Sequence, residues 1–193
     1  DMPALFNGNY HPAVRYNAML LVAGLNTQEA DGNAKRPPVA NPQALTVMLD
    51  GCEKADQHDV VLLAGLLGIY RHVDLDSQLE ALTNRNGPID GAGRNRIATL
   101  MNKLLKQEKP AGRSNAAHHW LRRQALEVLA AVPGSAATAA PLALSIIKNK
   151  DEATSVRCAA ARAISRIAFD QENPGITATE VAADLGTLAS VFC

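Results

Sequence analysis

The amino-acid sequence predicts an all-α fold, and three observations support this prediction. Apolar residues recur at intervals of three and four along most of the 193 residues, which is the spacing of one face of an α-helix. Alternating runs of β-branched residues, which are typical of strands, are scarce. Proline and glycine lie between the periodic segments, where helices are expected to stop.

In the first half of the chain, four helices are expected over residues 11–25, 42–56, 58–73 and 91–108. Asn41-Pro42 offers an N-cap and a first-turn proline to the second of them. The side chains expected to face the core are Val14, Ala18, Leu21, Val22 and Leu25 in the first helix, Leu45, Met48, Leu49 and Cys52 in the second, and Ile97, Leu100, Met101, Leu104 and Leu105 in the fourth. Residues 27–41 and 74–93 are rich in Gly, Pro, Asn and Asp and are interpreted as loop insertions, with a short helix around 76–84.

In the second half, helices are expected over 115–132, 138–149 and 153–168, and a last one runs almost to Cys193. Thr177-x-x-Glu180 has the pattern of a capping box at the start of that last helix. Leu121, Ala125, Val128, Leu129 and Val132 form one apolar face, and Val156, Ala160, Ala163, Ile164 and Ile167 form another.

A short pattern recurs at the start of the helices. An aliphatic residue, an arginine, two further residues and an alanine begin at Val14, Leu121 and Val156, and the segment from Val60 keeps Ala64 but has Val61 in place of arginine. A second amphipathic helix follows each of these segments. We therefore predict one domain over residues 1–193, made of about four helical hairpins at 11–56, 58–108, 114–149 and 153–192.

This pattern resembles the HEAT repeat, a family whose helical hairpins stack into a right-handed α-solenoid. Such hairpins bury their apolar faces only against their neighbours. The resemblance implies a concave surface formed by the second helices and a polar ladder between repeats, in which an Asp lies about six residues before the Arg. Asp151 and Arg157 have this spacing, but Asn9 precedes Arg15 and Ala116 precedes Arg122, so the ladder is broken in this chain. The resemblance implies no catalysis. An ordinary globular helical bundle is the structural alternative.

Composition and motifs exclude several classes of function. Lys plus Arg and Asp plus Glu both number 19, so the net charge indicates no partner. The longest strongly apolar run, residues 60–70, is too short to cross a membrane. The three cysteines suit neither a disulfide framework nor a zinc site, and Cys52 and Cys158 are interpreted as small buried hydrophobes.

No catalytic, metal-binding or cofactor-binding residues are expected, because the common catalytic and nucleotide-binding motifs are absent. The five histidines have no arrangement suited to a metal ion. Residues 90–96, DGAGRNR, have two glycines before a helix. They are interpreted as a flexible turn rather than a phosphate site, because no strand precedes them.

The segment from 85 to 123 is the one strongly charged region, with nine basic and two acidic residues. Arg96, Lys103 and Lys106 share the face of their helix opposite the leucine stripe, and by the resemblance this row faces the concave groove. The row is either a binding strip for an acidic peptide or a nucleic-acid backbone, or simply the solvated face of an amphipathic helix. Trp120, the single tryptophan, either packs between repeats or anchors a partner.

The function expected from these observations is a non-catalytic protein–protein interaction module or scaffold. Its partner would be another protein or an acidic peptide, contacted through Arg96, Lys103, Lys106 and Trp120. The alternative is a nucleic-acid-binding protein of the HEAT-like base-repair glycosylase type, using the same basic strip. Zero net charge and an aromatic content of 4% make the alternative the weaker hypothesis, since such proteins hold phosphates in a strongly basic groove. The sequence does not indicate a compartment.

Overall fold

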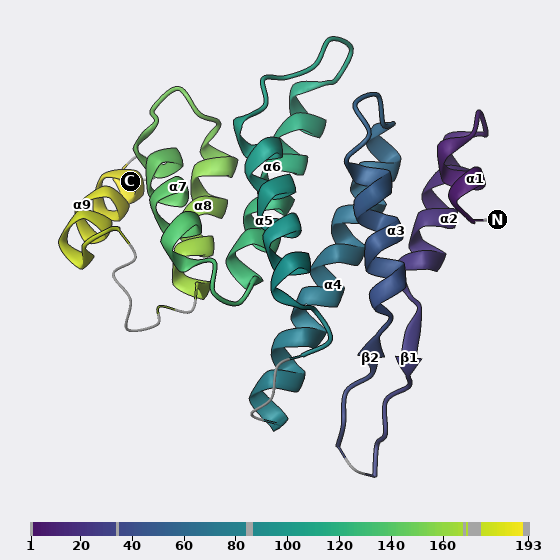
Figure 1. Cartoon of the computed structure of the whole chain (residues 1–193). Helices are drawn as coiled ribbons and strands as arrows, with labels where there is room; N and C mark the ends of the chain where they lie inside the picture. The colour runs from purple at the N-terminus through teal and green to yellow at the C-terminus, as the bar shows by residue number, and fades with distance from the viewer. Residues whose placement is uncertain (1, 34, 84–86, 168, 170–174, 191–193) are drawn as a thin grey trace. The chain divides into compact units, whose positions relative to one another are not determined.

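The computed structural model describes residues 2–33, 35–83, 87–167, 169 and 175–190, and over these residues the chain is all-α apart from one small β-ribbon (Figure 1). The helices are α1 (Met2–Asn7), α2 (Pro12–Ala23), α3 (Pro42–Cys52), α4 (Asp59–Thr83), α5 (Gly91–Lys106), α6 (Asn115–Ala131), α7 (Ala136–Lys148), α8 (Thr154–Arg166) and α9 (Ala178–Ala189). The chain divides into two compact units, Asp1–Leu100 and Met101–Cys193, and their boundary falls within α5.

The helix starts expected from the sequence are confirmed. The Asn41 side chain accepts a hydrogen bond from the backbone N–H of Gln43 at 2.9 Å, with Pro42 in the first turn of α3. Thr177 and Glu180 form the reciprocal capping box at the start of α9. These side chains satisfy backbone N–H groups that have no acceptor within the helix.

In the first unit, α4 packs against both α2 and α3, and α1 packs against α2. The approach is close because α4 carries glycines at the contacts. A Cβ atom on Gly65 would collide with the Sγ of Cys52, and one on Gly68 would collide with Met48 and with Ala23. The glycines of the apolar run at 60–70 are therefore packing positions.

The structure corrects two expectations for the insertions. The helix expected around 76–84 is present as far as Thr83, and residue 84 lies outside the described residues. It is not a separate short helix, because α4 runs without a break from Asp59 to Thr83 and buries Leu75, Asp76 and Leu79. Residues 26–40 are not simply a loop either: Asn26–Gln28 (β1) and Val39–Ala40 (β2) pair as antiparallel strands. This ribbon projects beyond α2 and α3 in Figure 1.

The inward face of α2 differs from the one predicted. Ala18 and Val22 are buried as expected, but Leu21 is 61% exposed, and Val14 and Leu25 are also exposed. Met19 and Ala23 occupy the core instead. Helix α2 carries apolar residues on more than half of its circumference, so periodicity alone could not decide which of two overlapping stripes α4 would cover.

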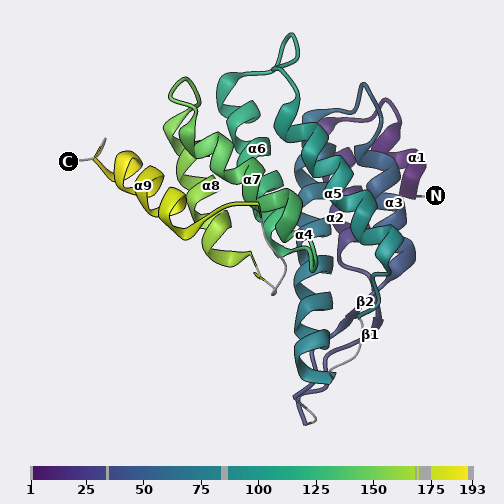
Figure 2. The same cartoon turned by 60° about the vertical axis from the view of Figure 1, so that its left-hand side comes forward.

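In the second unit, α8 packs against α6 and α7, and α7 also packs against α9 (Figures 1 and 2). The predicted core faces of α6 and α8 are confirmed, since Leu121, Ala125, Val128, Leu129 and Val132 and the corresponding residues of α8 are buried. The first helix of one hairpin thus contacts the first helix of the next within this unit, as α2 contacts α4 in the other.

Asp151 and Arg157, the pair with the spacing of the ladder, do not contact each other. Arg157 is buried and donates its Nε–H to the backbone carbonyl of Ile147 at 2.9 Å. Asp151 is exposed, and no ion pair joins it to Arg157. Arg157 therefore binds backbone rather than an acid.

Candidate functional site

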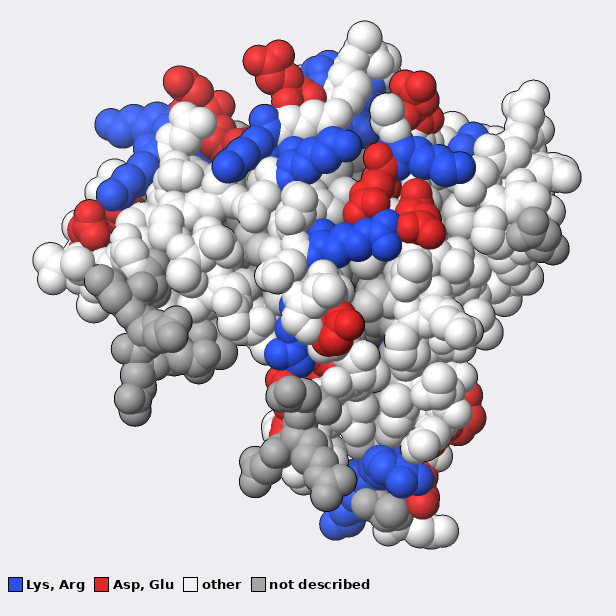
Figure 3. Space-filling model, in the orientation of Figure 1, with Lys and Arg blue, Asp and Glu red and all other residues white. Residues whose placement is uncertain are grey.

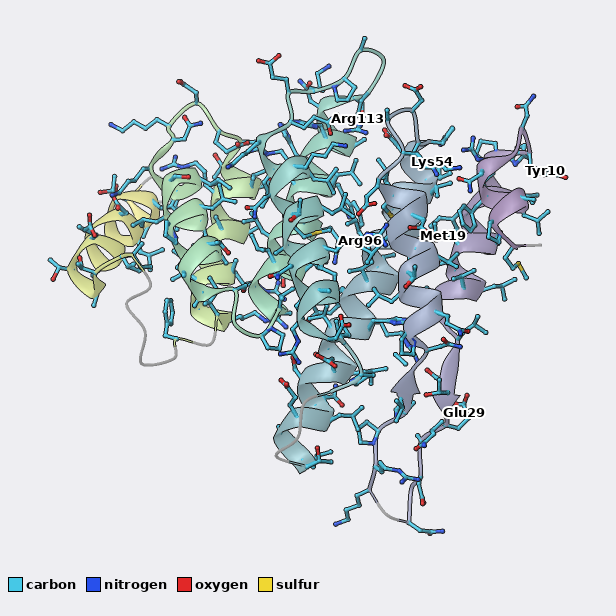
Figure 4. The ribbon with its side chains drawn as sticks, in the orientation of Figure 1. Tyr10, Met19, Glu29, Lys54, Arg96 and Arg113 are labelled. Carbon is cyan, nitrogen blue, oxygen red and sulfur yellow. The ribbon has the colours of Figure 1, made fainter. Side chains whose placement is uncertain are left out.

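Arg96 is neutralised by two acids at the C-terminal end of α3, Asp50 in its last turn and Glu53 directly after it. Its guanidinium donates to Glu53 Oε1 at 2.8 Å, to Glu53 Oε2 at 2.7 Å and to Asp50 Oδ1 at 2.5 Å. These hydrogen bonds hold the pKa of Arg96 above its usual value. Figure 4 shows Arg96 extending from α5 toward α3, and Figure 3 shows acidic side chains beside basic ones there. A partner that used Arg96 would have to displace two carboxylates.

The other two members of the predicted row differ from Arg96. Lys103 and Lys106 are exposed on α5, and within the described part of the chain neither forms an ion pair. Two lysines one turn apart are an ordinary solvated helix face unless a partner is present. Of the predicted row, Lys103 and Lys106 therefore remain unpaired among the described residues, whereas Arg96 is paired with Asp50 and Glu53.

Trp120 lies half-buried in a groove between α6 and α8, both in the second unit. The groove has a volume of about 380 Å³. Helix α6 lines it with Trp120, Arg123, Gln124 and Glu127. Helix α8 lines it with Ser155, Cys158, Ala159 and Arg162. Because Ser155, Cys158 and Arg162 are exposed, the groove is open to solvent along one side.

The two sets of lining residues occupy equivalent positions of the repeat. When Leu121 is aligned with Val156, as the repeated pattern requires, Trp120 matches Ser155, Arg123 matches Cys158 and Gln124 matches Ala159. At these three positions the α6 side chain is the larger one, whereas at the fourth Glu127 matches Arg162. Short α8 side chains leave part of the space between the helices unfilled.

The charges of the groove are balanced at one end only. Glu127 forms ion pairs with Arg162 at 3.3 Å and with Arg166 at 2.5 Å. Arg123 has no ion pair with any described residue, and its buried Nε lacks a hydrogen-bond partner among them. The adjacent Arg122, in contrast, pairs with Glu152 at 2.5 Å. Arg123 is thus the unpaired charge of this site.

The sequence singled out Trp120 but missed Arg123 as a site residue, and it placed Cys158 wrongly. Cys52 is buried as expected, whereas Cys158 is an exposed free thiol in the groove. Alignment of the repeats puts Cys158 at the position of Arg123, beside the arginine of the repeated pattern rather than on the apolar face. The alignment of the repeats could therefore have predicted from the sequence that Cys158 is exposed.

A second hollow of about 310 Å³ lies between α3 and the start of α5, within the first unit. Leu45, Leu49 and Ile89 line it, and Arg96 lies on its edge. The backbone N–H of Gly93 at this helix start donates to the Asp90 carboxylate at 2.7 Å. The N-terminus of α5 therefore already holds an anion of the chain, which disfavours a phosphate site at DGAGRNR.

Two of the five histidines, His72 and His118, are buried. His72 is 1% exposed, and burial lowers its pKa to about 4. His118 is also buried, and its pKa is lowered by burial and by the nearby Arg122. Within the described ranges, no three His, Cys, Asp or Glu side chains lie close enough together to hold a metal ion.

No family model, curated protein or solved structure matches this chain. Among the helices that the structure describes, none combines the length and apolar character needed to cross a membrane. The class of protein that the fold defines is thus an all-α protein of packed helical hairpins.

Proposed function

We propose that this chain is a HEAT-like repeat module that binds a segment of another protein in the groove between α6 and α8. One observation carries the proposal: the single tryptophan and an arginine without an acidic partner line one open groove formed by equivalent positions of two hairpins. Tryptophan and arginine are the side chains that most often dominate binding energy at protein interfaces. The repeated arginine pattern and the contacts between first helices support the HEAT-like assignment.

The location differs from that expected of the family, because α6 and α8 are first helices of their hairpins. The second helix α5 carries Lys103 and Lys106, which offer less for a specific contact. They line neither of the two hollows described above, and Arg96 is already paired. Exposed lysines of this kind contribute mainly to the rate of encounter and only modestly to affinity.

A protein segment suits the groove better than a nucleic acid does. Neutralising a phosphate backbone requires several free cations in a row, whereas Arg162 is committed to Glu127 and Arg122 to Glu152. A stack of bases needs successive aromatic surfaces, and the groove has one, Trp120. The groove thus offers a phosphate backbone one unpaired cation, Arg123, and the basic row offers Lys103 and Lys106.

Selection from a random peptide library displayed on phage tests the proposal. Selected peptides, labelled with fluorescein, are expected to lose at least about tenfold in affinity for Trp120→Leu and to bind the double variant Lys103→Gln/Lys106→Gln as tightly as the unchanged chain. Because Trp120 is the only tryptophan, its fluorescence also reports binding at the groove directly.

Two results would contradict the proposal. One is a set of selected peptides whose affinity is unchanged in Trp120→Leu. The other is tight binding of a labelled oligothymidylate that is lost in Lys103→Gln/Lys106→Gln, which would establish the nucleic-acid hypothesis instead.

A further inference from the structure

We infer that the α6–α8 groove recognises an acidic side chain of its partner, which pairs with Arg123, next to an apolar side chain that lies on Trp120. This inference rests on the proposed function and adds the chemistry of the ligand. The partner is therefore a short acidic and apolar segment of a protein, held in an extended conformation.

The first step is the state of Arg123. It lines the groove, its Nε is buried without a hydrogen-bond partner among the described residues, and it has no ion pair with them. An arginine that is partly withdrawn from water loses hydration, and a carboxylate restores the lost hydrogen bonds with two parallel contacts. Arg122, one residue earlier, pairs with Glu152 through one of its terminal nitrogens, whereas Arg123 has no carboxylate partner among the described residues.

The second step is the distribution of the other charges. Arg162 lines the same groove, but Glu127 binds it at 3.3 Å and binds Arg166 as well. The end of the groove at Glu127 is therefore closed to a further acid by its own carboxylate. One free positive charge remains, at Arg123, so the groove suits one carboxylate rather than a row of phosphates.

The third step is the length of the groove. From Trp120 to Glu127 the α6 axis rises about 10 Å, and an extended peptide of about three residues spans the same distance. Trp120 lies about one helical turn from Arg123, which places an aromatic surface beside the cation. The small side chains of Ser155, Cys158 and Ala159 leave room for a backbone between the helices.

The test is a thermodynamic cycle with selected peptides. In peptides obtained by the library selection, we expect Asp and Glu to be enriched relative to the library. For a synthetic peptide from that set, replacing its acid by the neutral amide should weaken binding at least fivefold, as followed by Trp120 fluorescence. In Arg123→Gln the acid and amide peptides should bind equally, which assigns the preference to this pair of groups.

Two further variants keep the test sharp. Arg123→Lys retains the charge and should retain a preference for the acidic peptide, which separates a charge effect from a loss of folding. Lys150→Gln removes a cation of the same unit that lies outside the groove, and it should leave the preference unchanged. Increasing salt should reduce the preference in the unchanged chain but not in Arg123→Gln.

The possible failures are distinguishable. If selected peptides quench Trp120 but carry no excess of acids, or if their acid preference persists in Arg123→Gln, the groove binds peptides and the assignment to Arg123 is wrong. If selected peptides neither alter Trp120 fluorescence nor respond to Trp120→Leu, the proposed function fails together with this inference.

Discussion

Arg157 on α8 donates its Nε–H to the backbone carbonyl of Ile147, the penultimate residue of the preceding helix α7, at 2.9 Å. Arg15 makes the same contact in the other unit, to the carbonyl of Phe6 in α1, also at 2.9 Å. Each arginine is the fourth residue of its helix, and each acceptor is the last but one of the helix before it. Since the last carbonyls of a helix have no partner within it, the repeated arginine caps one helix from the next.

The corresponding arginine of the third repeat, Arg122, has a different partner. Arg122 lies one turn deeper in α6, which begins at Asn115, and it pairs with Glu152 instead.

Replacing Arg157 should therefore destabilise the second unit. Arg157→Met leaves the Ile147 carbonyl without its buried donor, and a lost partner of this kind costs about 1–3 kcal/mol. Chemical denaturation measures the change in the free energy of unfolding. Arg162→Met is the control: its side chain is 68% exposed, and removing it should cost less than about 1 kcal/mol. Equal costs for the two variants would show that the carbonyl contact contributes nothing specific.

Gly65 on α4 should not tolerate a methyl group. In Gly65→Ala the new Cβ collides with Cys52 Sγ, and overpacking of a core costs about 1–3 kcal/mol, against a gain of at most about 1 kcal/mol in helix propensity. Gly91→Ala in the same unit meets no atom within 4 Å and should be neutral or slightly stabilising. The midpoint of thermal unfolding compares the two, and a stabilised Gly65→Ala would mean that α3 and α4 lie further apart.

The two described thiols should differ in reactivity. Cys158 is exposed, whereas Cys52 is 4% exposed and burial raises its pKa to about 12. In a Cys193→Ser background, Ellman's reagent at pH 8 should titrate one thiol in the native protein and two after unfolding. A bound groove peptide should slow the native reaction. Rapid native reaction of both thiols would contradict the packing of α3 against α4.

The pH dependence of stability should contain a contribution from His72. Burial lowers the pKa of His72 from 6.5 to about 4. Between these two pH values the imidazole is therefore protonated in the unfolded chain but neutral in the native chain. The contribution of His72 to the free energy of unfolding is fully present above pH 6.5, and up to about 3 kcal/mol of it is lost as the pH falls toward 4. The free energy of unfolding, measured from pH 7 to 4.5, should fall less steeply in His72→Gln. Parallel curves would place His72 in contact with water.

Most helices were predictable because each repeats its apolar residues over three or more turns. The faces of α3, α5, α6 and α8 follow directly from residues such as Leu49, Met101, Leu129 and Ile164, which are buried as predicted. Helix α2 was not, since its apolar residues fit two faces. A helix around 76–84 was expected, but its continuity with residues 58–73 was missed because Asp74 and Asp76 look like loop residues. Asp76 is in fact buried, where it accepts the N–H of Ile89 at 2.9 Å and binds Arg94 at 2.8 Å.

The candidate site was harder to predict, because a groove depends on the sizes of side chains that face each other. Trp120 was identifiable as the single tryptophan. Arg123 stands out as an unpaired cation only when the structure shows that Glu127 and Glu152 form ion pairs with other arginines. Arg96 illustrates the converse. Its place in a basic row suggested a free cation, and acids more than forty residues earlier, Asp50 and Glu53, neutralise it.

Hydrogen–deuterium exchange of the chain with and without a selected peptide tests most directly whether the α6–α8 groove is the binding surface. Slower exchange confined to residues 120–127 and 155–162, absent in Trp120→Leu, is the predicted result. Protection that falls instead on α3 and α5, with the α6 and α8 segments unchanged, would contradict it.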